Sequence, residues 1–371
     1  SDSPTPTGQI AAAQRLLQRE QKPLIVLDGV LNLDVDAVLA ATPTITIHNG
    51  ATLLVTNSAG GAYRSYTNNQ AVFLRGGSWL AGAILNTNLV EGFGTIDGAG
   101  VENTGRLLAT NGALWARLAG VTNLPTATIG TRSTNAVLDL QLPGGADGYV
   151  NQGTVTLAGG SLLFNGAAGG TITNTSTGTL IGVGDLTAKT VVNDGAILAA
   201  NPMGAFSVFS VAVSDFASAS ATLGAASNTT LNLLLSGGGG TAFANNGTIS
   251  MTGGALAISN GAPGLITNAF LVSGYGTVSP AIWNQGTIVA QVPGGGGTLT
   301  IGLFGGTNAA AGHLRAGQGA TLLVTNGFVN LGTIGADGLA GGDIQVGFTG
   351  AGVLTNRGTI AGNNPNAPLS F

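Results

Sequence analysis

Trp283-Asn284-Gln285-Gly286-Thr287-Ile288 is the stretch that decides the fold, because versions of it recur along most of the chain. The shared pattern is a small apolar or aromatic residue, Asn, a variable residue, Gly, a small residue and an aliphatic residue. Successive copies place their Asn residues between 26 and 52 residues apart. Repetition at this period is typical of repeat architectures. The recurring pairs are Asn103 and Gly105, Asn151 and Gly153, Asn193 and Gly195, Asn245 and Gly247, Asn284 and Gly286, Asn330 and Gly332, and Asn356 and Gly358.

Short apolar runs separate these repeats, and in most of them an aliphatic residue alternates with Thr or Ser, as in Thr298-Leu299-Thr300-Ile301. This period of two is typical of a strand with one buried face. A strand of four residues buries too little surface by itself, but stacked copies pair their backbones and build a continuous core. An immunoglobulin-like tandem or a propeller would need longer strands and clearer hairpin signals. The sequence therefore predicts an all-β, single-stranded parallel β-solenoid.

The Asn-x-Gly element is expected to form a corner of each repeat. Asn and Gly tolerate the left-handed backbone conformation that a sharp bend needs. Asn side chains at the same corner of successive coils can also stack their amides into a ladder. Because the repeat holds several strands, one coil is expected to take about half of it.

Composition excludes several classes of protein. Only 7% of the residues are charged, and no Asp, Glu, Lys, Arg or His lies between Phe216 and Gly312. A surface with so little charge tolerates self-association. The chain has no Cys, which excludes disulfides and thiolate metal sites. Eleven Lys and Arg residues and a pI near 4.9 argue against a nucleic-acid partner. No apolar run reaches the roughly 18 residues of a transmembrane helix.

Residues 1–41 differ from residues 42–371, which we assign to the solenoid. Gly8 to Gln21 is predicted to form a short helix that Pro23 ends, and a strand-like run follows it. We expect this segment to cap the solenoid or to join subunits. Its candidate subunit contacts are Leu16, Leu17, Leu24, Ile25, Val26 and Leu27.

These repeats resemble the passenger regions of autotransporters and the filamentous-haemagglutinin type of secreted adhesin, over roughly residues 42–362. The resemblance implies a right-handed parallel β-helix, export to the bacterial cell surface, and adhesion or fibre building. The start at Ser1-Asp2-Ser3-Pro4 is that expected of a mature end left after cleavage. Two departures from these families are expected to matter: we recognise no C-terminal translocating barrel, and no secretion domain of the haemagglutinin type at residues 1–40.

No catalytic, cofactor-binding or metal-binding residues are predicted. Sites in β-helical polysaccharide enzymes need converging carboxylates; the candidates here, Asp34 with Asp36, Asp139 with Asp147, and Asp185 with Lys189 and Asp194, are expected to be structural. Trp115 and Trp283 lie in strand repeats, where we expect burial or stacking between coils. The candidate glycan contacts lie in a polar loop expected to be exposed, and they are Tyr63, Arg64 and Tyr66.

The sequence thus favours an extracellular structural protein, first of all a self-assembling surface filament subunit joined head to tail. The segment after Asn356 to Ile360 is short and without a helix, so we expect an open C-terminal coil that accepts the N-terminal segment of the next subunit. The alternative is a monomeric adhesin that binds host or matrix glycans. A polysaccharide-degrading enzyme is the third interpretation.

Overall fold

A computed structural model describes most of the chain. The described residues are 23–34, 44–56, 64–141, 148–165, 170–201, 207–218, 220–236, 243–259, 265–294, 296–325, 327–336, 343–346, 353–361 and 369–370. They form about 12 turns of a parallel β-solenoid, and none of them is helical. The chain divides into two compact units, unit 1 from Ser1 to Thr173 and unit 2 from Asn174 to Phe371.

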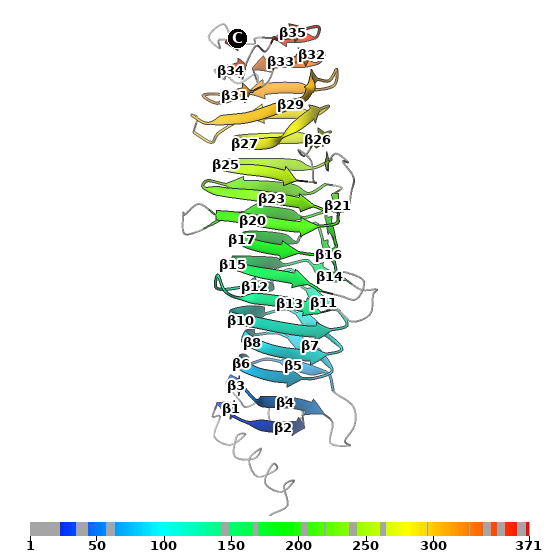
Figure 1. Ribbon diagram of the computed structural model, residues 1–371, viewed down its shortest axis with the longest axis vertical. Helices are drawn as coiled ribbons and strands as arrows, with labels where there is room; N and C mark the ends of the chain where they lie inside the picture. Colours follow the sequence, from blue (N-terminus) through cyan, green and yellow to red (C-terminus); the bar gives the residue numbers. More distant parts are fainter. Residues whose placement is uncertain are drawn as a thin grey trace, which may run out of the picture. The chain divides into compact units, whose positions relative to one another are not determined.

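Unit 1 consists of short parallel strands, each paired with the corresponding strand of the next turn (Figure 1). Its strands are β1 (Leu24–Val26), β2 (Gly29–Asp34), β3 (Thr44–His48), β4 (Ala51–Thr56), β5 (Tyr66–Asn68), β6 (Ala71–Leu80), β7 (Ala83–Asn86), β8 (Leu89–Gly98), β9 (Gly100–Asn103), β10 (Arg106–Leu118), β11 (Val121–Asn123), β12 (Thr128–Thr131), β13 (Val137–Gln141), β14 (Tyr149–Asn151), β15 (Thr154–Phe164) and β16 (Thr171–Asn174), which ends on the first residue of unit 2.

One turn of the solenoid, here called a coil, has three faces. Strand β6 covers two of them, because its first half pairs with β3 and its second half with β4. We call these face A and face B. The third, face C, carries the short strands that end in Asn, such as β5, which pairs with β7. Along the chain each coil runs from face C to face A and then to face B.

Glycine makes the bend between faces A and B possible. Gly92 in unit 1 has φ +138° and Gly274 in unit 2 has φ +111°, conformations that side-chain-bearing residues rarely adopt. A Cβ atom on either would also overlap a carbonyl oxygen of the preceding coil, that of Leu74 or of Met251. The recurring Gly-x-Gly element therefore places a single side chain at this bend, Phe93 in unit 1 and Tyr275 in unit 2.

Unit 2 repeats the same three faces. Its strands are β17 (Thr179–Thr187), β18 (Thr190–Asn193), β19 (Ala196–Ala199), β20 (Ser207–Val213), β21 (Asp215–Ser218), β22 (Thr222–Ala226), β23 (Thr229–Leu235), β24 (Phe243–Asn245), β25 (Thr248–Ser259), β26 (Leu265–Asn268), β27 (Leu271–Asn284), β28 (Thr287–Ala290), β29 (Thr298–Asn308), β30 (His313–Ala316), β31 (Thr321–Val324), β32 (Val329–Asn330), β33 (Thr333–Ala336), β34 (Asp343–Val346), β35 (Thr355–Asn356), β36 (Thr359–Ala361) and β37 (Leu369–Ser370).

The core follows from alternation along the strands. In β3 the aliphatic Ile45 and Ile47 are buried, whereas Thr44, Thr46 and His48 between them are partly exposed. The same column of buried aliphatics recurs in register in successive coils, and each such side chain contributes roughly 1.5–3 kcal/mol of burial. This arrangement confirms the predicted parallel β-solenoid with aliphatic residues inside.

The N-terminal segment is only partly described. The predicted helix from Gly8 to Gln21 lies outside the described residues. Strands β1 and β2 pair in register with β3 and β4, so they form the first described coil of the solenoid. No helix in the described part of the chain is long and apolar enough to span a membrane.

Candidate functional site

The recurring Asn residues are the last residues of the face C strands, and apart from the exposed Asn356 their side chains are buried. In unit 1 each amide Nδ2 donates to the Oδ1 of the Asn in the next coil. The distances are 2.8 Å from Asn68 to Asn86, 2.6 Å to Asn103, 2.9 Å to Asn123 and 2.8 Å to Asn151. All five side chains are buried. The predicted amide ladder is therefore confirmed, and it runs through the core.

The ladder contains Asn residues that the repeat pattern missed. The Asn-x-Gly element marks only part of the coils, and the other coils carry Asn without the following Gly. A second signal identifies several of them, namely an aliphatic residue followed by Thr-Asn, as in Val121-Thr122-Asn123 and Ile266-Thr267-Asn268. The missed ladder residues are Asn68, Asn86, Asn123, Asn174, Asn268 and Asn308.

Many of these amides also bind a backbone carbonyl oxygen near the corner. Asn123 Nδ2, for example, lies 3.1 Å from the carbonyl oxygen of Thr154 in the following coil. The corner Gly is needed for space, since a Cβ on Gly105 would overlap the carbonyl oxygen of Asn88. None of the seven corner Gly residues has a positive φ, and the non-Gly residues that do, Asn111 and Asn228, lie outside the ladder. The expected left-handed corner conformation is therefore wrong.

In unit 2 the ladder is interrupted once. Asn174 Nδ2 donates to Asn193 Oδ1 at 2.6 Å, but Asn193 Nδ2 is buried and has no hydrogen-bond partner. The backbone register places Ser218 of β21 opposite Asn193, where an Asn would continue the series. The ladder resumes at Asn245 and continues at 2.8 Å per step through Asn268, Asn284, Asn308 and Asn330 to Asn356.

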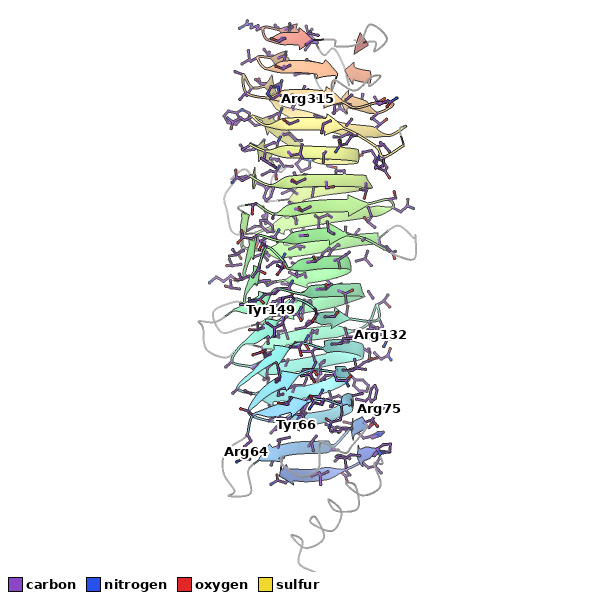
Figure 2. The ribbon with its side chains drawn as sticks, turned by 180° about the vertical axis from the view of Figure 1, so that it is seen from behind. Arg64, Tyr66, Arg75, Arg132, Tyr149 and Arg315 are labelled. Carbon is purple, nitrogen blue, oxygen red and sulfur yellow. The ribbon has the colours of Figure 1, made fainter. Side chains whose placement is uncertain are left out.

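The candidate glycan contacts do not form a common surface. Tyr66 is only 2% exposed; its hydroxyl donates to Gln70 Oε1 at 3.0 Å and its ring packs edge-on against Trp79. The expectation that Tyr66 is exposed is therefore wrong, because it occupies an inward position of β5. Arg64 is exposed, and Tyr63 lies outside the described residues. Figure 2 shows Tyr66 and Arg64 near the beginning of unit 1.

Trp115 and Trp283 are 41% and 45% exposed, so the expectation that they are buried is wrong. Each lies between two inward residues, Leu114 and Ala116 or Ile282 and Asn284, and alternation places it on the outer face. The fully buried tryptophan is Trp79.

Around Trp115 the outer side of face B carries polar side chains from four successive coils. Arg117 lies 3.9 Å from Asp97. Asp139, the register partner of Trp115, is 6% exposed and accepts hydrogen bonds from Gln141 at 2.9 Å and Asn165 at 3.0 Å. An exposed indole beside amide and carboxylate groups is chemically suited to contact a polar partner that also has an apolar face.

The candidate subunit contacts divide by burial. Leu24 and Val26 point inward from β1 and are buried, whereas Ile25 and Leu27 are exposed, as is Val30 of β2. Among the described strands, β1 and β2 pair on one edge only, with β3 and β4. Leu16 and Leu17 lie outside the described residues.

The carboxylates considered for catalysis are spread around the coil. Asp185 lies on the outside of β17, Lys189 in the turn before β18, and Asp194 in the corner after it. Asp36 and Asp147 lie outside the described residues.

A groove of about 420 Å³ crosses the outside of face C in unit 1, and Glu102 is the one charged residue that lines it. In the described part of the chain no group of three or more His, Cys, Asp or Glu residues is placed to hold a metal ion.

Comparisons of the chain with models of protein families, with curated proteins and with solved structures found no match.

Proposed function

We propose that the protein is an extracellular structural subunit of a bacterial surface filament, whose solenoids join head to tail. The observation that carries this proposal is the direction of the amide ladder. In each of these coil-to-coil bonds the earlier Asn donates and the later Asn accepts, so Asn356, the last described Asn of the ladder, keeps a donor for a further coil. An interface with this polarity joins unlike ends and propagates.

The last described coil supports the same interpretation. Asn356 is exposed, and its Nδ2 donates to the carbonyl oxygen of Gly358 at 3.2 Å. The equivalent Asn330 uses its amide both for Gly332 and for Asn356. The second amide hydrogen of Asn356 has no such acceptor in the described chain, where a following subunit would supply one.

Open strand edges provide the rest of the contact. Strands β35, β36 and β37 pair, among the described strands, only with β32, β33 and β34 of the preceding coil. In the first described coil β1 and β2 pair, among the described strands, only with β3 and β4, and this coil carries exposed Ile25, Leu27 and Val30. Unpaired parallel strand edges accept strands of another chain.

Negative-stain microscopy of the purified chain tests this proposal. We expect filaments from the full chain and none after removal of residues 1–40. Asn356→Asp should also abolish filaments, because the carboxylate still accepts from Asn330 but removes the donor and places a charge in the joint. Asn246→Asp makes the same chemical change at an exposed corner and should leave filaments intact.

Full-length protein that remains as single particles at high concentration would contradict the filament. That outcome favours the second candidate, a monomeric adhesin, whose supporting observation is the exposed Trp115 with its polar neighbours. We propose no enzymatic activity, since the candidate carboxylates that can be placed do not converge.

A further inference from the structure

A hollow of about 480 Å³ lies at the bend between faces A and B of unit 1, over strands β6, β8 and β10. Four outward side chains from two neighbouring coils surround it. Phe73 is in register with Glu91, and Arg75 is in register with Phe93. Aromatic and charged side chains therefore alternate in a two-by-two arrangement, and Thr110 and Asn111 complete the wall.

The charges of this hollow do not cancel. Arg132 donates two hydrogen bonds to Glu91, at 2.9 Å to Oε2 and 3.2 Å to Oε1, and so neutralises that carboxylate. Arg75 is exposed and makes no hydrogen bond or ion pair with any described residue. The hollow thus presents one available guanidinium in a chain with a formal charge of −4.

The aromatic wall is held in place by glycine. Hypothetical Cβ atoms on Gly76 and Gly112 would lie 3.2 and 3.3 Å from Phe93, so this side chain packs against both glycines. Phe93 remains 36% exposed. Asn111 adopts φ +54° and its backbone N–H donates to Ser133 Oγ at 3.1 Å, which fixes the opposite wall. Figure 2 shows Arg75 and Arg132 on the same side of unit 1, away from Arg64.

We propose that this hollow binds a carboxylate attached to a six-membered ring. The guanidinium of Arg75 pairs with the carboxylate in fork geometry, and Phe73 and Phe93 cover the apolar face of the ring. The volume is in the range of small-ligand sites and holds one or two rings. Two sources share this chemistry, a hexuronic acid residue of an acidic polysaccharide and a free aromatic acid. The site does not depend on the filament, because it lies on the side of the coils and not at their ends.

Calorimetric titration of the intact chain tests the proposal with four probes: trigalacturonate, phenylacetate, galactotriose and inorganic phosphate. We expect binding of trigalacturonate or of phenylacetate, and none of the neutral sugar or of phosphate. Binding of the uronate alone identifies a saccharide as the source, and binding of phenylacetate alone identifies an aromatic acid.

Arg75→Gln should weaken binding roughly tenfold or more, because it removes a charged hydrogen-bond donor. The thermal unfolding of this variant should not change, since Arg75 makes no hydrogen bond or ion pair with a described residue. Arg106→Gln is the matched control, an equal change of charge at an exposed residue of the same face that does not line the hollow. Phe93→Leu should also weaken binding.

The proposal is overturned if neither ring carboxylate binds, if galactotriose or phosphate binds as well as they do, or if Arg106→Gln weakens binding as much as Arg75→Gln. These outcomes are independent of whether the chain forms filaments.

Discussion

The amide ladder is continuous in unit 1 and interrupted in unit 2. Five buried Asn side chains from Asn68 to Asn151 form an unbroken series, whereas Asn193 ends its series with an unpartnered Nδ2. An unpaired buried amide group costs on the order of 1–3 kcal/mol. The fold therefore tolerates the loss of one step, and at this point another contact joins the coils.

Aromatic packing supplies that contact. Phe216 of β21 and Phe243 of β24 lie in the two coils that follow Asn193, with ring centroids 5.6 Å apart in an edge-to-face arrangement. Such pairs contribute about 0.5–1.5 kcal/mol beyond their buried area. Face C therefore has two inward columns, one of apolar or aromatic side chains and one of Asn, and at Ser218 the apolar column continues where the amide column is interrupted.

The largest expected effect comes from removing one Asn in each unit. Asn103→Ala in unit 1 leaves Asn123 Oδ1 without its donor and removes the acceptor of Asn86, so we expect a loss of roughly 2–4 kcal/mol in unfolding free energy. Asn193→Ala in unit 2 removes an amide that already lacks an acceptor, so the loss should be about half as large. Urea unfolding followed by circular dichroism measures both. Equal losses would remove the distinction between the two series.

Alkaline pH should act on unit 1 through two buried phenols. Burial raises the pKa of both Tyr66 and Tyr149 above the ordinary value of 10.0. The unfolded chain therefore loses these protons first as the pH rises. The contribution of the two phenols to the unfolding free energy is fully present below pH 10 and declines above it. Above pH 10 the unfolding free energy should fall by up to about 1.4 kcal/mol per pH unit for each tyrosine.

Urea unfolding at pH 8, 10 and 11 measures this decline. The double variant Tyr66→Phe with Tyr149→Phe should flatten the decline above pH 10, after allowance for the hydroxyl bond from Tyr66 to Gln70. An unchanged decline would show that other groups cause it.

The smallest effect is a repair. Ser218→Asn places an amide opposite Asn193, where it can accept from the unpartnered Nδ2, so we expect a gain of about 1 kcal/mol. Ser218→Ala is the control and should give no gain. Equal unfolding free energies for Ser218→Asn and the parent chain would mean that an amide at position 218 does not continue the ladder.

The sequence predicted the parallel solenoid and the amide ladder, because Asn-x-Gly repeats and period-two alternation are local patterns. It located only the ladder residues followed by Gly, and missed Asn123 and Asn268, whose corners are built from other residues. The register between strands of successive coils decides which outward side chains become neighbours, and this register cannot be read from the sequence. Glu91 and Arg132 bind each other although 41 residues separate them. Arg75 lies beside Phe93 because the strands of successive coils, which differ in length along the chain, pair in this register.

The spacing of the ladder also has a consequence for how the chain folds. The ladder bonds join residues between 16 and 28 positions apart, so every coil finds its partner in the adjacent stretch of chain. Folding of each unit can then start at any pair of neighbouring coils and advance one coil at a time, with each finished edge acting as the template for the next. Contacts of such short range also favour folding during synthesis, before distant parts of the chain exist.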